Sequence, residues 1–403
     1  MQRVNAMCAA LDLEPAFPII TVGGTNGKGS CCALLEAMLL AASYRVGCYT
    51  SPHLLRYNER VRIGGREADD ATLCQAFEQI EVVRSGAAGN IPLTYFEFGT
   101  LAALHVFMQT RIEVAILEVG LGGRLDAVNA FDTDCALVTS VDLDHTEYLG
   151  DTRDKIGFEK AGIFRAGKPA VCADRDPPQA MLVHAARIGV ALLRIERDFG
   201  HAADNTQWQY WGPGGKRFGL PLPSLRGAYQ LDNASACITV LDCLRERLPV
   251  AAQDVRNGLT QATLPARFQV LPGRPLVVLD VAHNPQAARV LADNLDSLPP
   301  GGAMIAVCGI LKDKDIAGIV AAIGRQITHW HVAALEGPRG ASAQQLMDEL
   351  YRAGVTVPVT SHAAVAVAWH AACKEAGEND KIIVFGSFLT VAAVMREYAG
   401  ARS

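Results

Sequence analysis

Short apolar runs recur along the first half of the chain, and segments with helical periodicity separate several of them. The runs cover residues 19–22, 46–50, 114–119 and 135–141. Continuous apolar runs of this length are typical of strands that are buried on both faces of a parallel sheet. The pattern therefore predicts alternating α/β architecture for this half.

The segment after the first run predicts an amphipathic helix over residues 30–42. Leu34, Leu35, Met38 and Leu39 share one face of this helix, whereas Glu36 falls on the opposite side. We expect the apolar face to pack on the sheet.

A second set of strand-like runs covers residues 275–281, 304–310, 330–335 and 382–385. Between the two sets, residues 194–225 change to short alternating stretches broken by glycine and proline, which predicts a small β insertion. Little apolar periodicity remains around residues 264–267 and 271–273, so we expect a hinge there. The predicted domains are therefore 1–266 and 267–403, with the reaction site expected in a cleft between them.

Composition narrows the class of protein. The chain has 403 residues, of which 50% are hydrophobic and 20% charged, and its formal net charge is -5. The sequence contains no block of like charges, so its charge pattern does not indicate a nucleic-acid or membrane-surface partner. The 11 cysteines form no CxxC pair, which disfavours a disulfide framework or a zinc site. Because no signal pattern or membrane-length apolar run occurs, we expect a cytoplasmic protein.

The motif with the clearest chemistry lies at residues 23–30, Gly-Gly-Thr-Asn-Gly-Lys-Gly-Ser, between the first predicted strand and the first predicted helix. Glycines let backbone N–H groups converge on an anion, the helix presents its positive end, and Lys28 adds a charge for the outer phosphates. The segment predicts a nucleoside triphosphate site. It is a variant of the P-loop, because Gly29 separates the lysine from the hydroxyl of Ser30.

Polar side chains follow several other predicted strands. Glu118 ends one strand and is a candidate Mg²⁺ ligand, and Asp142, Asp144 and His145 follow the next. Ser51, which carries a hydroxyl, lies in a turn at the end of a further predicted strand. Since parallel strands end at one edge of a sheet, we expect these groups to converge near Lys28. The glycines after Glu118 are not a dinucleotide fingerprint, because position 125 is leucine.

Three further segments have a structural and a functional interpretation. Lys160 is an ordinary solvated helix residue unless it belongs to a larger pattern. Residues 280–285, Asp-Val-Ala-His-Asn-Pro, leave a strand and enter a helix, so Asn284 is a predicted helix cap while Asp280 is a candidate for binding ribose or phosphate. His329 and His331 share one strand face, but no third ligand is visible in the sequence, so we interpret them as structural.

An ordered series of motifs carries a family resemblance across essentially the whole chain. The motifs are residues 24–30, 50–54, 58–61, 95–97, 118–129, 143–146, 159–165, 267–269, 280–285, 336–340 and 386–388. In this order they resemble the folylpolyglutamate synthase family, which is related to the Mur ligases, and most of all its bifunctional members that also make dihydrofolate.

The resemblance implies a fold and an activity. The fold would be an N-terminal P-loop-type mononucleotide-binding α/β domain with a small β insertion, followed by a smaller C-terminal Rossmann-like α/β domain. The activity would be ATP-dependent amide formation, in which the carboxylate of dihydropteroate or of a reduced folate is phosphorylated and L-glutamate displaces the phosphate. Mg²⁺, two ions per site, would assist, and we expect a monomer.

The resemblance also implies site residues. Nucleotide binding would fall to Thr25, Asn26, Gly27, Lys28, Gly29, Ser30, Asn233, Arg267 and Asp280. Metal ligands would be Ser51, Glu118 and His145, with Ser30 for the second Mg²⁺ and Lys160 as a carbamate, which requires a desolvated lysine of lowered pKa. Pterin contacts would be Thr94, Tyr95, Phe96, Glu97, Leu125, Asp126 and Ala127, with Phe96 stacking on the ring. Lys28, Lys160 and His283 are the candidate catalytic residues.

Several alternatives follow from these motifs. Family members usually carry a further segment before the first strand, whereas Met1 here lies almost at the Gln2-Arg3-Val4 that normally follows it. In the family this segment helps shape the folate end of the cleft, so the resemblance alone does not fix the folate affinity of this chain. A monofunctional folylpolyglutamate synthase and a nucleotide-binding module without ligase activity are the alternatives. A ligase acting on cell-wall nucleotide precursors is disfavoured, because it predicts a separate domain before Thr25.

Overall fold

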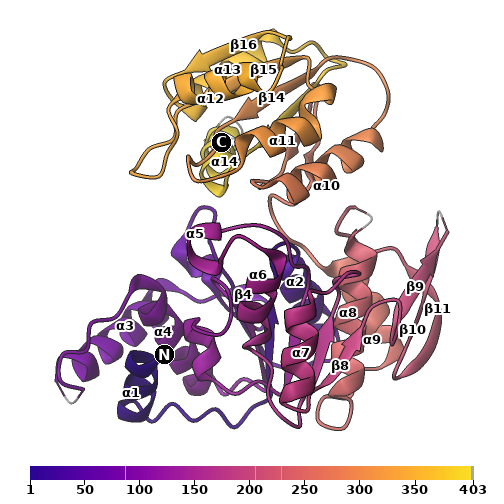
Figure 1. Cartoon of the computed structure of the whole chain (residues 1–403). Coiled ribbons are helices and arrows are strands. Elements are labelled where there is room, and N and C mark those ends of the chain that lie inside the picture. Colours follow the sequence, from indigo (N-terminus) through magenta and orange to yellow (C-terminus); the bar gives the residue numbers. More distant parts are fainter. Residues whose placement is uncertain (87, 205, 228, 401–403) are drawn as a thin grey trace. The chain divides into compact units, whose positions relative to one another are not determined.

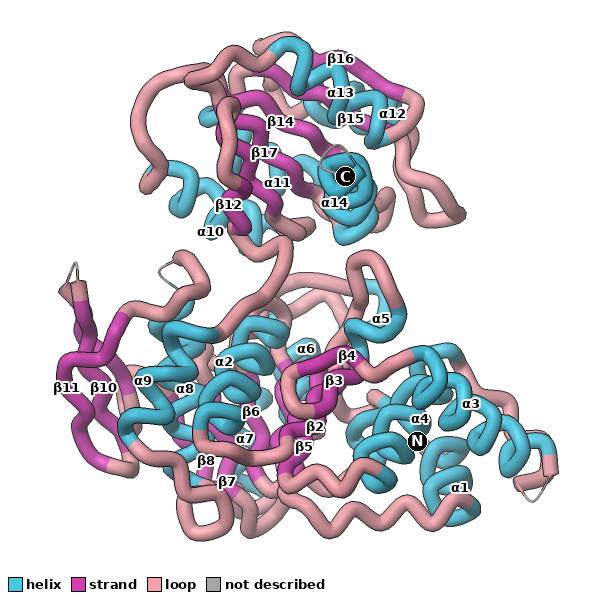
Figure 2. The backbone as a smooth tube through the Cα atoms, turned by 180° about the vertical axis from the view of Figure 1, so that it is seen from behind, coloured by secondary structure: helices cyan, strands magenta, loops and turns pink. Residues whose placement is uncertain are grey.

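The structure is a computed structural model that describes residues 1–86, 88–204, 206–227 and 229–400. Its internal contacts divide the chain into two compact units. The first unit comprises Met1–Ser224 and Tyr229–Thr263, and the second is built mainly from residues 264–400. Each unit is an α/β structure with its own sheet (Figures 1 and 2).

The first unit is built on an eight-stranded sheet in the order β4-β3-β2-β5-β1-β6-β7-β8. The strands are β1 (Ile19–Gly23), β2 (Val46–Tyr49), β3 (Val61–Ile63), β4 (Arg66–Glu67), β5 (Val114–Glu118), β6 (Cys135–Val138), β7 (Pro169–Cys172) and β8 (Ala191–Arg194). β2, β5, β1, β6, β7 and β8 run parallel, which confirms the predicted architecture. The sequence pattern missed β3 and β4, which are short and antiparallel, and also the parallel strands β7 and β8, which lie outside the four predicted runs.

Helices cover both faces of this sheet. The helices are α1 (Gln2–Ala10), α2 (Lys28–Ala41), α3 (Asp70–Ser85), α4 (Tyr95–Gln109), α5 (Thr146–Leu149), α6 (Arg153–Ala161), α7 (Gln179–Arg187), α8 (Tyr229–Cys243) and α9 (Ala252–Gln261), with 3-10 turns η1 (Tyr57–Arg60) and η2 (Ala127–Ala130). Ala115 and Leu117 of β5 belong to a core shared with α1, α3, α4, α6 and α7. On the other face α2 packs against α8 and α9. The central strands are consequently buried on both sides, as their continuous apolar sequence requires.

The predicted β insertion is a three-stranded antiparallel sheet in the order β11-β10-β9. It consists of β9 (Gly200–Ala203), β10 (Gln207–Gly212) and β11 (Gly215–Pro221). Trp208 and Tyr210 alternate inward and are buried, and the Tyr210 hydroxyl donates to Asp242 Oδ2 of α8 at 2.9 Å. The insertion is thereby fixed to the first unit.

The second unit contains a six-stranded sheet in the order β12-β13-β17-β14-β15-β16. Its strands are β12 (Gln269–Leu271), β13 (Leu276–Leu279), β14 (Met304–Cys308), β15 (His329–Ala333), β16 (Val359–His362) and β17 (Lys381–Phe385). Its helices are α10 (Pro285–Asp296), α11 (Ile316–Ile323), α12 (Ala343–Arg352), α13 (Val365–Glu375) and α14 (Phe388–Gly400), with the turn η3 (Gly324–Gln326). α10, α11 and α12 share a core on one face, and α13 packs on β14, β15 and α14.

The division between the two units falls between Thr263 and Leu264, where the predicted hinge begins, but Leu271 of its second part belongs to a strand. Residues 269–271 form β12, which pairs antiparallel with β13, and Ala266 and Phe268 just before it are buried. The sequence signal failed because a three-residue edge strand is too short to show alternation.

Glu36 is also an exception to the expected polar face of α2. Its carboxylate is buried and accepts two hydrogen bonds at Oε2 from Arg62 of β3, from Nη2 at 2.7 Å and from Nε at 2.9 Å. Arg62 also donates to Thr50 Oγ1 at 3.1 Å. The pair ties the helix after the glycine loop to the antiparallel edge of the sheet.

We predict that Glu36→Ala lowers the free energy of unfolding by about 3–5 kcal/mol, because it leaves the Arg62 charge desolvated without its partner. Urea denaturation followed by circular dichroism would measure this. The double variant Glu36→Leu/Arg62→Met should recover most of the loss. Asp151→Ala, which breaks an exposed pair with Lys155, is the control and should change stability little. A Glu36→Ala effect no larger than the control would contradict the prediction.

Candidate active site

The glycine-rich loop between β1 and α2 is fixed against the end of β6. The Thr25 amide donates to the Ser140 carbonyl at 2.7 Å, and Thr139 Oγ1 donates to the Asn26 carbonyl at 2.6 Å. Gly24 has a φ of 145°, and a Cβ at this position would lie 1.8 Å from Thr139 Oγ1. Glycine is therefore required there by both backbone conformation and space.

Lys28 begins α2, and its ammonium lies over the loop. Its Nζ donates to the carbonyl of Gly24 at 3.0 Å and to that of Thr25 at 3.1 Å. The positive charge and the amino end of a 14-residue helix thus coincide. This is the electrostatic environment that binds the phosphates of a nucleotide.

The α8 helix brings one further predicted nucleotide residue, Asn233, to the loop, together with Gln230, which was not predicted. Gln230 Nε2 donates to the buried Ser30 hydroxyl at 3.4 Å, and Asn233 Nδ2 donates to Gln230 Oε1 at 3.1 Å. A Cβ on Gly27 would lie 3.0 Å from Asn233 Oδ1. The structure therefore places Asn233 beside the loop, although more than 200 residues separate Gly27 from it in sequence.

The predicted metal ligands lie at the carboxyl ends of neighbouring strands. Glu118 ends β5, is 4% exposed, and accepts the Ser51 amide at Oε2 at 2.9 Å. His145 directly precedes α5 with a φ of 51°, and its amide donates to Asp144 Oδ1 at 2.8 Å. Because β2, β5, β1 and β6 are adjacent, these groups belong to one edge of the sheet together with the glycine loop.

Lys160 lies near the end of α6 and is 3% exposed. Burial and, to a smaller extent, the Lys28 charge lower the pKa of its amine to about 7, while Asp144 acts in the opposite direction. The expectation of a desolvated lysine with a lowered pKa is confirmed. It also places Lys160 within electrostatic reach of the loop lysine and of the residue before His145.

The predicted pterin residues fall into two groups. Thr94 and Glu97 form a capping box at the start of α4, in which the Glu97 amide donates to Thr94 Oγ1 at 3.2 Å. Asp126 accepts the Leu121 amide at 2.8 Å, and burial raises the pKa of its carboxyl to about 6. These side chains, with the buried Ala127, hold the local backbone in place.

The second group is available to a ligand. Tyr95 is 64% exposed and Leu125 is 62% exposed. Phe96 packs against the backbone of Gly120, where a Cβ would lie 2.6 Å from its ring, and its centroid is 5.9 Å from that of Tyr49. Close packing fixes the orientation of this ring.

Arg60 is a residue to which sequence reasoning gave no role. Its guanidinium lies 5.6 Å from the Tyr57 ring centroid and 5.4 Å from that of Tyr95, and its Nε donates to His53 Nδ1 at 2.8 Å. It is buried at the end of η1. The only sequence signal was its place in the motif at residues 58–61.

The second unit gathers its own predicted residues at the carboxyl end of β13. Asp280 accepts the amides of Phe268 at 2.7 Å and Ala282 at 2.8 Å, and the Arg267 guanidinium lies 5.4 Å from the Phe388 ring centroid. Desolvation raises the pKa of the Asp280 carboxyl, while the Arg267 charge lowers it.

His283 and Asn284 follow Asp280. The His283 ring centroid lies 6.2 Å from that of Phe388, and its Nδ1 lies 2.8 Å from the Val281 carbonyl. Asn284 caps α10 by accepting the Ala287 amide at 2.9 Å, which confirms the predicted cap. Asp280, His283 and Arg267 are thus held together by backbone contacts and by Phe388.

Comparison with known families identifies the class. Residues 22–241 match the Mur ligase middle domain, and residues 266–388 match the Mur ligase glutamate ligase domain. The glycine loop and the predicted metal ligands Ser51, Glu118 and His145 lie in the first region, and the Asp280 cluster lies in the second. The chain is a member of the Mur ligase class of proteins.

Closer relatives specify the family. The chain is 44% identical over 404 residues to the dihydrofolate synthase/folylpolyglutamate synthase of Escherichia coli (strain K12), covering 100% of this chain and 92% of that protein. It belongs to the dihydrofolate synthase/folylpolyglutamate synthase family.

Solved structures agree with this assignment. E. coli FolC in complex with DHPP and ADP matches with a TM-score of 0.94 and 43% identity, covering 100% of this chain and 94% of that one. A bifunctional folylpolyglutamate synthase/dihydrofolate synthase with Mn, AMPPNP and L-glutamate bound matches with a TM-score of 0.91 and 47% identity, covering 99% and 94%. None of the helices that the structure describes is long and apolar enough to cross a membrane.

We predict that the stability difference between the Lys160→Met variant and the wild type depends on pH. The wild-type lysine has a lower pKa when folded, so the unfolded chain binds more protons between about pH 7 and pH 10 and wild-type stability rises over that range. Methionine cannot titrate. The advantage of Lys160→Met should therefore be constant below about pH 7 and shrink by on the order of several kcal/mol as the pH rises.

Urea denaturation in CO₂-free buffers at several pH values would measure this difference. Lys155→Met, on the same helix but in an exposed ion pair, is the matched control and should show little pH dependence. Parallel curves for Lys160→Met and the wild type would refute a lowered pKa.

Proposed function

We propose that this protein is an ATP-dependent ligase that joins the carboxylate of 7,8-dihydropteroate to L-glutamate and then adds glutamate to reduced folates. The reaction passes through an acyl phosphate and releases ADP and phosphate. The observation that carries the proposal is the glycine loop with Lys28 next to Glu118, Ser51 and His145 at one sheet edge. Relatives that bind ADP with DHPP, and AMPPNP with Mn and L-glutamate, support it.

The charge of the reactants explains this arrangement. Phosphorylating a carboxylate brings two anions together, so Lys28, the loop amides and the helix end lower the repulsion and align the groups. Thr25, Asn26, Gly27, Gly29 and Ser30 supply the loop contacts, and Asn233 adds an amide beside them. No nucleophile from the protein is required, because the substrate carboxylate attacks the phosphate directly.

The residues present fit divalent metal ions. A buried carboxylate and two hydroxyls supply oxygen ligands of the kind that Mg²⁺ prefers, and the imidazole adds one nitrogen. Ser51, Glu118 and His145 would hold one ion and Ser30 the other. Bound Mg²⁺ neutralises phosphate charge during transfer. The Mn in a solved relative supports metal-dependent use of ATP.

Lys160 is proposed to become a carbamate. Its lowered pKa of about 7 provides the neutral amine that attacks CO₂, forming an N–C bond and releasing one proton. The product is an anion in place of a cation, which would serve as a further metal ligand. Native mass measurement with and without CO₂, on the wild type and on Lys160→Met, would detect it.

The two domains have different proposed roles. Domain 1–266 binds ATP, Mg²⁺ and the pterin, and domain 267–403 is the glutamate-ligase domain. Arg267 and Asp280 contribute to nucleotide binding, and His283 assists loss of protons from the glutamate amine. The support for this assignment is their position together at the end of β13, where ligands bind in open α/β sheets.

The pterin is proposed to lie against Phe96, with Tyr95, Leu125 and the capping residues Thr94, Glu97, Asp126 and Ala127 around it. Phe96 is held by Gly120 and Tyr49, so little conformational entropy is lost when a flat ring stacks on it. Because these positions resemble the dihydropteroate site of the bifunctional family members, we favour both activities over a monofunctional folylpolyglutamate synthase.

We predict that ADP and phosphate release requires ATP, L-glutamate and dihydropteroate together. A coupled ADP assay that omits one substrate at a time would measure this, and replacing dihydropteroate by tetrahydrofolate would test the second activity. Release with tetrahydrofolate but not with dihydropteroate, each with ATP and L-glutamate present, would indicate the monofunctional enzyme. ATP binding without turnover on either substrate would indicate a nucleotide-binding module without ligase activity.

We predict that Phe96→Ala raises the KM for dihydropteroate by roughly three- to tenfold, because a stacking contact is lost. The KM for ATP should not change, because the glycine loop is untouched. Phe98→Ala is the matched control, since Phe98 lies on the same helix but packs on Phe77. Steady-state kinetics of the three proteins would decide. Equal KM values for dihydropteroate in the two variants would remove Phe96 from the pocket.

A further inference from the structure

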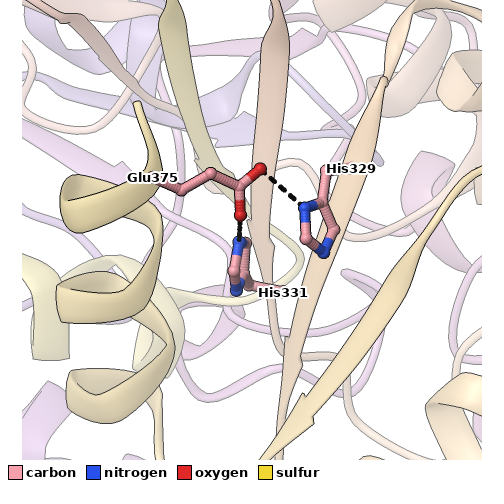
Figure 3. A group of neighbouring side chains, drawn as sticks. All are labelled: His329, His331 and Glu375. Carbon is pink, nitrogen blue, oxygen red and sulfur yellow. Dashed lines mark hydrogen bonds and ion pairs between the residues drawn. The ribbon is translucent and has the colours of Figure 1, made fainter. Parts of the chain in front are cut away.

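Three side chains outside the proposed active site meet in the second unit. His329 and His331 belong to β15 and are separated by one residue, so they project from the same face of the sheet. Glu375 is the last residue of α13, which packs on that strand. Figure 3 shows the carboxylate of Glu375 facing both imidazole rings. The cluster could not be recognised in the sequence, because Glu375 is more than 40 residues away from His331.

The distances show that the three side chains already converge. Glu375 Oε1 lies 2.6 Å from His329 Nδ1, and Oε2 lies 3.1 Å from His331 Nε2 (Figure 3). One ligand atom from each residue can be chosen so that all lie within 4.8 Å of one another. Around a tetrahedral ion with bonds of about 2.0–2.1 Å, neighbouring ligand atoms would be about 3.3 Å apart. Only small side-chain movements would bring these atoms around one ion.

The outer nitrogens of both rings already have partners. His331 Nδ1 lies 2.9 Å from His362 Nε2, and His329 Nε2 lies 2.9 Å from Thr360 Oγ1, both on β16. When an ion occupies the inner nitrogen, the remaining N–H of each neutral ring can be donated to these groups. Partners of this kind fix the tautomer and orientation of metal-ligating histidines.

Burial and charge favour a cation at this point. The side chain of His331 is 4% exposed and that of His329 is 18% exposed, while Glu375 at 40% leaves a path to solvent. Glu375 also adds its negative charge to the carbonyl end of α13, where a cation is stabilised.

We propose that His329, His331 and Glu375 form a site for one divalent transition-metal ion of the Zn²⁺ class, with water as the fourth ligand. Imidazole nitrogens with one carboxylate suit such an ion better than Mg²⁺, which prefers oxygen ligands. The site is separate from the proposed ligase chemistry: His329 begins β15, whereas Asp280 and His283 follow the carboxyl end of the parallel strand β13. The ion would tie α13 to β15 and stabilise the second unit.

Zinc binding to the full chain tests this proposal. The protein, purified without a histidine tag and treated with chelator, is dialysed against Zn²⁺ at known free concentrations, and bound metal is counted. We expect Glu375→Gln and His329→Gln to lower the affinity for one equivalent by more than about tenfold, since loss of a mere supporting partner already has that effect. Zn²⁺ should raise the melting temperature of the wild type and not that of these variants.

Two further variants make the result specific. Glu397→Gln, which breaks the exposed contact with His370 of α13, is the matched control and should bind like the wild type. Glu118→Gln removes a proposed ligand of the other metal site and should keep the zinc equivalent assigned here. Zinc that is lost in Glu118→Gln but kept in Glu375→Gln would overturn the proposal, as would equal binding by Glu375→Gln and the wild type.

Discussion

The close contact between the glycine loop and the end of β6 is the constraint on which the rest of the first unit depends. Gly24 approaches Thr139 so closely that no side chain fits, and the Thr25 and Asn26 backbone is held by Ser140 and Thr139. This contact exists only because β1 and β6 are neighbours in a parallel sheet. It aims the start of α2 and the Lys28 charge at the same edge where β5 ends in Glu118. Strand order therefore determines which chemical groups meet.

The electrostatics of that edge follow from burial. Lys28 and Lys160 are two basic groups within electrostatic reach of one another, and burial together with the Lys28 charge lowers the pKa of Lys160. Placing two cations together is unfavourable unless anions or a chemical change compensate for it. A nucleotide beside Lys28, and conversion of Lys160 into an anion, would each relieve the repulsion. The electrostatics of the site therefore favour the state with bound nucleotide and modified Lys160 over the empty, unmodified state.

In the second unit, two clusters of side chains lie at opposite ends of the parallel strands. Asp280, His283 and Phe388 gather after the strands end, which is where ligands bind in open α/β sheets. The histidines of β15 lie beneath the end of α13, and Glu375, the last residue of that helix, contacts them. Because α13 returns antiparallel to the strands it follows, its last residue reaches the beginning of β15. One fold thus supports a proposed catalytic cluster and a proposed structural metal site without mixing them.

The sequence alone determined the α/β architecture, the buried central strands, the β insertion, the glycine loop and the cap at Asn284, because each depends on local periodicity or on a short motif. It also carried the family, through the order of motifs. Only the tertiary structure decided which distant residues meet. Glu36 is buried because Arg62 of β3 reaches it, residues 269–271 form an edge strand because β13 pairs with them, and Arg60 lies against the rings of both Tyr57 and Tyr95. His329 and His331 gain Glu375 only when α13 packs on β15, since a contact across more than 40 residues leaves no local pattern.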